Sequence, residues 1–148
     1  MISEKDLQIV KQLRQNARTN LASIASATNT PKSTVFDRIG KLEEDVIKKH
    51  ASIVDFKKLG YHARYVFLIR VKPDCRESLR EFLSSQPCVN NLHITNSDFD
   101  FLFEAIFKDN KEMNDFKSEL DSNFPITQIR QHELIEDLYR EQFRGGNI

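Results

Sequence analysis

The stretch that decides the fold runs from Thr19 to Leu42 and reads TNLASIASATNTPKSTVFDRIGKL. Its first half has a narrow apolar stripe at helical spacing, formed by Leu21, Ile24 and Ala25. The turn falls at Thr28-Asn29. A second helix then starts sharply, because Thr30 can cap it and Pro31 suits the first helical position, where a missing N–H costs nothing. Its apolar positions also repeat at helical spacing, at Val35, Ile39 and Leu42. Two helices joined by a tight turn predict a helix-turn-helix.

The second of these helices offers a polar outward face. With Val35 at 0° and about 100° per residue, Ser33, Asp37 and Gly40 point away from the apolar side. Asp37 could accept a hydrogen bond from cytosine, and hydroxyl and basic groups could bond bases or phosphates. The residues expected to meet DNA here are Lys32, Ser33, Thr34, Asp37, Arg38 and Lys41. A solvated face with an ordinary Asp37–Lys41 ion pair remains the alternative.

The segments on either side complete an N-terminal domain over residues 1–60. Before the decisive stretch, Ser3 and Asp6 have the spacing of a helix cap, and Thr19 could cap the next helix. After it, residues 48–54 resemble a basic β-ribbon, and Lys48 and Lys49 are expected to lie on the DNA backbone as a wing. A turn at Gly60, with positive φ, then leads into the rest of the chain.

Residues 61–148 alternate strand and helix patterns. The strands are predicted over residues 65–71, 89–95, 99–107 and 126–138. One helix opens at Pro73-Asp74, and another is capped by Asp109 with Glu112 three residues on. The order βαββαβ predicts a ferredoxin-like domain, and the whole chain is of the α+β class.

One face of this predicted sheet lacks a cover. In the third strand Phe101 and Phe103 share the face that the helices cover, whereas Leu102 and Ile106 lie on the other face. Because both helices of a βαββαβ fold pack on one side, Leu102 and Ile106 suggest a partner sheet and hence a homodimer. Ordinary exposure of single apolar residues is the alternative.

Composition narrows the class of protein further. The chain has 148 residues and a net charge of zero, but residues 1–60 carry 11 basic and 7 acidic residues, net +4, and the remainder is net −4. The absence of a bilayer-spanning apolar run or a signal-peptide pattern predicts a cytoplasmic protein. Cys75 and Cys88 are expected to be reduced thiols. The sequence shows no motif for catalysis, a metal or a cofactor.

These residues resemble the Lrp/AsnC family, the feast/famine transcription regulators, along nearly the whole chain. The matching motifs are Asp6, Ile9 and Leu13, then Gln15 to Thr19, Ile24-Ala25, Pro31 to Val35, Arg38-Ile39, Leu42 to Glu44, Val46-Ile47 and Ala51 to Gly60. The resemblance implies a winged helix-turn-helix, a βαββαβ regulatory domain, dimers paired through their sheets, and further assembly, commonly into octamers. It also implies binding to pseudo-palindromic operators, nucleoid association, and modulation by an amino acid.

The chain departs from the family pattern at several positions. Asp45 replaces the usual glycine, and Asp37 and Gly40 stand where basic residues are frequent. The effector-loop motif reads Ser97-Asp98-Phe99-Asp100, with serine in the glycine slot. Ser97, Asp98 and Asp100 are therefore the candidate effector residues. Whether an amino-acid effector binds at all stays open.

Two other functions remain to be weighed. One is an architectural protein that organises DNA with little sequence preference. The other is an enzyme like the sirohaem decarboxylases, which share this architecture and would need groups such as His93 and His132 around a tetrapyrrole. The neutral overall charge and Asp37 argue against the architectural protein. The enzyme would not need a helix that begins at Thr30-Pro31 with basic neighbours, so a sequence-specific DNA-binding regulator is favoured over both.

Overall fold

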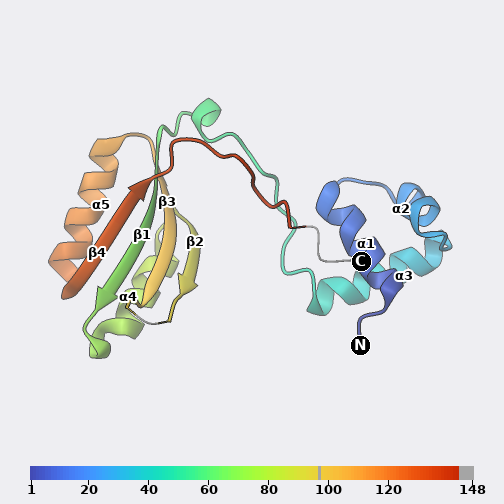
Figure 1. Ribbon diagram of the computed structural model, residues 1–148, viewed down its shortest axis with the longest axis horizontal. Coiled ribbons are helices and arrows are strands. Elements are labelled where there is room, and N and C mark those ends of the chain that lie inside the picture. The colour runs from blue at the N-terminus through green and yellow to red at the C-terminus, as the bar shows by residue number, and fades with distance from the viewer. Residues whose placement is uncertain (97, 144–148) are drawn as a thin grey trace. The chain divides into compact units, whose positions relative to one another are not determined.

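The computed structural model describes residues 1–96 and 98–143, and its contacts divide the chain into two compact units (Figure 1). One unit is Met1–Ile53 together with the C-terminal segment from Tyr139, and the other is Val54–Leu138. The domain boundary that the sequence analysis set after residue 60 stays a prediction.

The first unit is built from three helices, α1 (Glu4–Gln15), α2 (Leu21–Thr28) and α3 (Lys32–Asp45). One buried side chain or more from each helix meets in a small core formed by Ile9, Ile24, Val35 and Leu42. The apolar spacing read from the sequence is therefore the packing that holds α2 and α3 together, as predicted for a helix-turn-helix.

Of the three predicted N-terminal caps in this unit, only that of α1 is confirmed. Ser3 and Asp6 form the predicted capping box at the start of α1. For α2 the expected cap Thr19 is wrong, because the Asn20 side chain accepts the hydrogen bond from the Ser23 N–H. The start of α3 is also one residue later than expected: Pro31 is itself the N-cap, and the Thr30 hydroxyl donates to the Thr28 carbonyl instead.

The β-ribbon expected over residues 48–54 is absent, since this segment has no strand. Lys48 turns back and its Nζ donates to the Asp45 carbonyl at 2.6 Å, while His50 Nε2 lies 2.9 Å from the Glu43 carboxylate. A strand needs a partner for its backbone groups, and these contacts attach the segment to α3 instead. A 3₁₀ turn at Lys57–Leu59 then ends at Gly60, which has the predicted positive φ of 89°.

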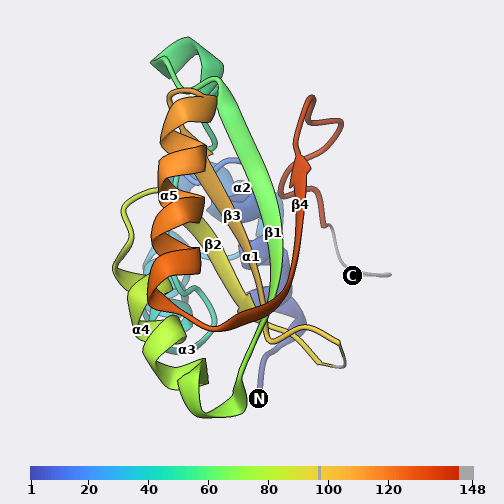
Figure 2. The same cartoon turned by 90° about the vertical axis from the view of Figure 1, so that its left-hand side faces the viewer.

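The second unit is a four-stranded antiparallel sheet with two helices (Figure 2). Along the chain come β1 (Ala63–Val71), a 3₁₀ turn (Pro73–Cys75), α4 (Arg76–Ser85), β2 (Val89–Ile94), β3 (Phe101–Phe107), α5 (Asn110–Asn123) and β4 (Ile126–Glu133). The strand order is β2-β3-β1-β4, and Figure 2 shows α4 and α5 on the same side of the sheet. The predicted βαββαβ fold is confirmed.

Aromatic packing fills the space between sheet and helices. The rings of Phe67 and Phe103 stack 4.9 Å apart, and Phe116 of α5 meets both edge-on. The predicted alternation in β3 is confirmed, because Phe101, Phe103, Ala105 and Phe107 are all buried. Three predicted strand limits are too wide, since β2 ends at Ile94, β3 begins at Phe101 and β4 ends at Glu133. The first strand begins two residues earlier than predicted, at Ala63.

The cap of α5 gives a direct test of this local analysis. The Asp109 carboxylate accepts the Glu112 N–H at 2.9 Å. Asp109→Ala should lower the free energy of unfolding by about 1 kcal/mol, because the helix loses its cap. Asp121→Ala, at the C-terminal end of the same helix, should not, since an acidic group there opposes the helix dipole. Urea denaturation followed by circular dichroism measures both, and equal losses would contradict the assignment.

Candidate nucleic-acid interface

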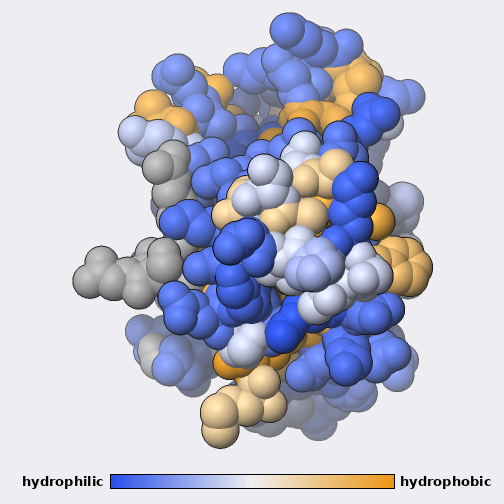
Figure 3. Space-filling view, turned by 90° about the vertical axis from the view of Figure 1, so that its right-hand side faces the viewer, coloured by the Kyte–Doolittle hydropathy of each residue, from blue (hydrophilic) through white to orange (hydrophobic). Residues whose placement is uncertain are grey.

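The outward face of α3 carries the side chains that the sequence predicted to meet DNA. Lys32, Ser33, Asp37 and Lys41 are exposed, and Thr34 and Arg38 are half-buried. Figure 3 shows one side of the molecule, where hydrophilic residues predominate and more hydrophobic ones lie among them. This face therefore offers hydroxyl, carboxylate and ammonium groups to a ligand, which suits base edges and phosphates.

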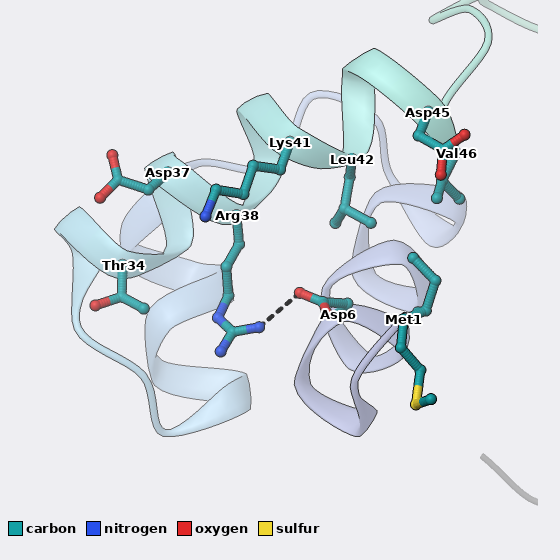
Figure 4. A pocket seen from close by; sticks show the side chains of 10 residues that line it. Met1, Asp6, Thr34, Asp37, Arg38, Lys41, Leu42, Asp45 and Val46 are labelled. Atoms are coloured by element: carbon teal, nitrogen blue, oxygen red, sulfur yellow. Dashed lines mark hydrogen bonds and ion pairs between the residues drawn. The ribbon is translucent and has the colours of Figure 1, made fainter.

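Arg38 has a partner within the protein. Its Nη1 donates to Asp6 Oδ1 at 2.7 Å and to the Ser3 hydroxyl at 3.0 Å (Figure 4). The predicted phosphate contact of Arg38 stays a prediction, and its remaining guanidinium nitrogens are the ones that could make it. The pairing itself fastens α3 to the first turn of α1, which sequence spacing did not reveal.

The Asp6 carboxylate accepts hydrogen bonds both from the start of α1 and from Arg38 on α3. The side chain of Ser3 and its backbone N–H bond the Asp6 carboxylate, and Arg38 lies beside it. These hydrogen bonds, with Arg38 contributing less than Ser3, lower the pKa of Asp6 from 3.8 to about 2. The carboxylate is thus held charged where it anchors the helix that carries the predicted DNA contacts.

A groove of about 450 Å³ runs along α3 beside this link. The residues that line it are Met1, Ile2, Asp6, Thr34, Asp37, Arg38, Lys41, Leu42, Asp45 and Val46. In Figure 4 Asp37 points away from Arg38. Within the described part of the chain Asp37 and Lys41 form no ion pair. The ordinary Asp37–Lys41 pair that the sequence left as an alternative is therefore absent there. The Asp37 carboxylate is exposed and open to a base.

The basic segment after α3 is exposed as well. Lys48, Lys49 and His50 all lie on the surface, and Lys48 is tied to the C-terminal end of α3. The two lysines accordingly sit in sequence and in space beside the helix that carries the predicted DNA contacts, although without the strand expected for a wing.

The uncovered sheet face holds the predicted dimer residues. Leu102 and Ile106 are half-buried, and Leu68 of β1 lies directly opposite Leu102. Between them Glu104 is 7% exposed, and it accepts from Arg64 Nη2 at 2.7 Å and from the Asn90 amide. These partners come from β1 and β2, so the alternation of residues within β3 alone does not identify them.

Arg64 also joins segments outside the sheet. Its Nη1 donates to Asp137 Oδ2 at 2.6 Å, and its guanidinium lies 5.8 Å from the centre of the Phe56 ring. Despite its burial, the two carboxylates raise the pKa of Arg64. The charges of Arg64, Glu104 and Asp137 are therefore paired within one chain.

The three candidate effector residues have different surroundings. Ser97 lies outside the described residues, and Asp98 is exposed. Asp100 accepts from the Val71 N–H at 2.9 Å, and its other oxygen pairs with Arg76 Nε at 2.7 Å. These contacts bind the end of β1 to α4 and account for the Asp100 carboxylate without a ligand. Effector binding by these residues stays a prediction.

Three further features concern residues 1–96 and 98–143: metal ligands, membrane-spanning helices and cysteines. No group of three or more His, Cys, Asp or Glu residues there could hold a metal ion. No helix in the same ranges is long and apolar enough to cross a bilayer. Cys75 and Cys88 are free, and burial raises the pKa of the Cys88 thiol to about 11.

Known proteins match both units. A family model of winged helix-turn-helix DNA-binding domains matches residues 2–45. The HTH-type transcriptional regulator FL11 of Pyrococcus horikoshii is 31% identical over 116 residues, which cover 78% of this chain and 77% of that protein. The solved structure of AsnC from E. coli has a TM-score of 0.83 at 18% identity and covers 98% of this chain and 99% of its own. A transcriptional regulator from Neisseria meningitidis, solved with L-Met, has a TM-score of 0.85 at 14% identity over 95% of this chain and 94% of its own.

The Asp6 link predicts a pH dependence. A carboxylate whose pKa is lower in the folded than in the unfolded state stabilises the fold above its unfolded pKa, near 3.9, and this stabilisation is lost as pH falls through about 2. Asp6→Asn should therefore unfold more easily at pH 7, by about 1 kcal/mol, and lose less stability than wild type between pH 4 and 2. Ser3→Ala should shrink the same dependence. Thermal unfolding across this range measures it, and parallel wild-type and Asp6→Asn profiles would refute the link.

Proposed function

The chain belongs to the Lrp/AsnC family of helix-turn-helix transcriptional regulators, and we propose that it reads duplex DNA with the outward face of α3. The observation that carries this is the exposed Asp37 carboxylate among hydroxyl and basic groups on a helix fastened to its neighbour through Arg38. A rigidly held helix presenting such groups can discriminate bases, whereas a merely basic surface would bind all sequences alike.

The side chains divide into two roles. Ser33, Thr34, Asp37 and Lys41 face base edges, and Asp37 accepts from a cytosine amino group. Lys32, Arg38, Lys48 and Lys49 neutralise phosphates, which positions the helix without adding sequence preference. Because the exposed Asp37 repels phosphate, affinity on unrelated DNA is modest, and the preferred site is distinguished by its bases.

Dimerisation supplies the rest of the affinity. The sheet face with Leu68, Leu102 and Ile106 is half-buried apolar surface around an Arg64–Glu104 pair that is already satisfied. A second copy can cover it while Arg64 and Glu104 stay bonded to each other, because burying a charge costs most when its partner is missing. Two recognition helices then enter successive major grooves about 34 Å apart. Assembly of dimers into octamers, and an amino-acid effector near Asp98 and Asp100, extend this proposal.

We also propose that the protein is not an enzyme and acts in the cytoplasm on nucleoid DNA. The histidines that a decarboxylase would need, His93 and His132, lie on β2 and β4, the two edges of the sheet. Three strand spacings separate those edges, about 14 Å, so the two rings do not converge on one substrate atom. Absence of a spectral change on mixing with sirohaem tests this directly.

Salt dependence separates the two roles. Lys49→Ala should weaken binding equally on all sequences and reduce the salt slope by about 1, because one phosphate contact is lost. Asp37→Ala should instead relax the preference at one base pair, a change of about 1–3 kcal/mol in discrimination. Lys111→Ala on α5 is the control and should change neither. Selection from random duplexes followed by binding titrations measures all three. Uniform losses for both α3-region variants, or featureless selection as for an organiser, would refute the assignment.

The dimer face has its own test. Leu102→Glu should shift the protein from dimer to monomer in sedimentation velocity, because an unpaired carboxylate would have to be buried in the contact. Ser118→Glu, on the exposed side of α5, should leave the dimer intact. Equal sedimentation of the Leu102→Glu variant and wild type would mean that the subunits associate elsewhere.

A further inference from the structure

Phe36 is an exposed aromatic side chain that the core of its unit does not use. It lies on α3 with 65% of its surface exposed, whereas Val35 beside it is fully buried. With Leu21, Ile39 and Gly40 it lines a shallow groove of about 650 Å³. A phenylalanine ring beside such a groove offers a flat apolar surface to a ligand.

The space beside this ring is open. A Cβ placed on Gly40, one helical turn after Phe36, would have no heavy atom within 4 Å. The other residues that line the groove are Asp37, Lys41, Glu43 and Glu44. Three of these four are acidic, so the groove disfavours a phosphate and suits an uncharged, apolar group.

Phe36 also lies on the proposed reading surface. It is the fifth residue of α3, within the N-terminal part of the helix that contacts bases in this class of domain. At about 100° per residue it stands about 60° from Ser33 and about 100° from Asp37. A protein partner seated here would cover the face that the proposed function needs for DNA. The group that contacts Phe36 should therefore belong to the DNA and be one that a major groove displays.

The apolar group that a major groove displays is the C5 methyl of thymine, and phenylalanine is among the side chains that contact it. We propose that Phe36, with the open space beside Gly40, binds this methyl and makes the protein prefer thymine at one position of each half-site. This inference rests on the proposed function, because it requires α3 to lie in the major groove.

Deoxyuridine isolates the methyl, because it pairs like thymine but lacks that one group. Each thymine of a duplex selected by the wild-type protein is replaced singly, and Kd is measured by fluorescence anisotropy. At one position per half-site wild type should lose about fourfold in affinity, the value of one buried methyl. Phe36→Ala should bind thymine and deoxyuridine equally there.

Leu59→Ala is the matched control. It removes another exposed apolar side chain, 61% exposed, from the sheet unit, so the deoxyuridine effect at the Phe36 position should persist. Circular dichroism checks that Phe36→Ala is folded, and Phe36→Leu, which keeps an apolar contact, should retain part of the effect.

The two proposals fail differently. If wild type selects a clear consensus but no thymine shows a loss that Phe36→Ala abolishes, the thymine contact is refuted and the DNA-reading function stands. If wild type selects no consensus, the proposed function fails, and the Phe36 contact fails with it.

Discussion

The arrangement of the helical unit depends on one carboxylate that does two jobs. Asp6 completes the capping box of α1 and holds Nη1 of Arg38 on α3 at 2.7 Å. The buried core of this unit is small, with four fully covered apolar side chains. The polar link adds to this apolar packing, because it joins α3 to the first turn of α1 at a defined point on each helix. The rotation of α3 decides which side chains face outward, so the surface offered to DNA depends on Asp6.

In the sheet unit a single arginine likewise joins several segments. Arg64 reaches Glu104 on β3, Asp137 after β4 and the ring of Phe56 before β1. The charges of Arg64, Glu104 and Asp137 are therefore paired inside one chain, while Leu68, Leu102 and Ile106 remain half-buried. These apolar side chains are the part of the face that we propose a second copy covers. Each unit thus has an arginine–carboxylate pair at the surface for which we propose a partner, DNA for α3 and a second copy for the sheet.

Local signals in the sequence were enough for most of the fold. Ser3 with Asp6, and Asp109 with Glu112, are hydrogen-bond patterns within one turn, and both form as predicted. The alternation in β3 also predicted the buried face correctly, because side-chain direction in a strand depends only on position. The caps of α2 and α3 were misplaced by one residue, since neighbouring Thr, Asn and Pro residues compete for the same role.

What the sequence could not show was long-range pairing. The Arg38–Asp6 and Arg76–Asp100 contacts join residues 32 and 24 positions apart, and no spacing rule reveals them. The β-ribbon predicted over residues 48–54 was wrong for the same reason. A strand forms only where a partner strand is available, and the local sequence does not show whether one is. The most direct measurement is hydroxyl-radical and methylation footprinting of the wild-type protein on its selected duplex. A dimer that reads DNA with both copies of α3 should protect two tracts in major grooves about 10 base pairs apart, centred on one consensus. Continuous protection along the duplex, or a single tract independent of sequence, would contradict it.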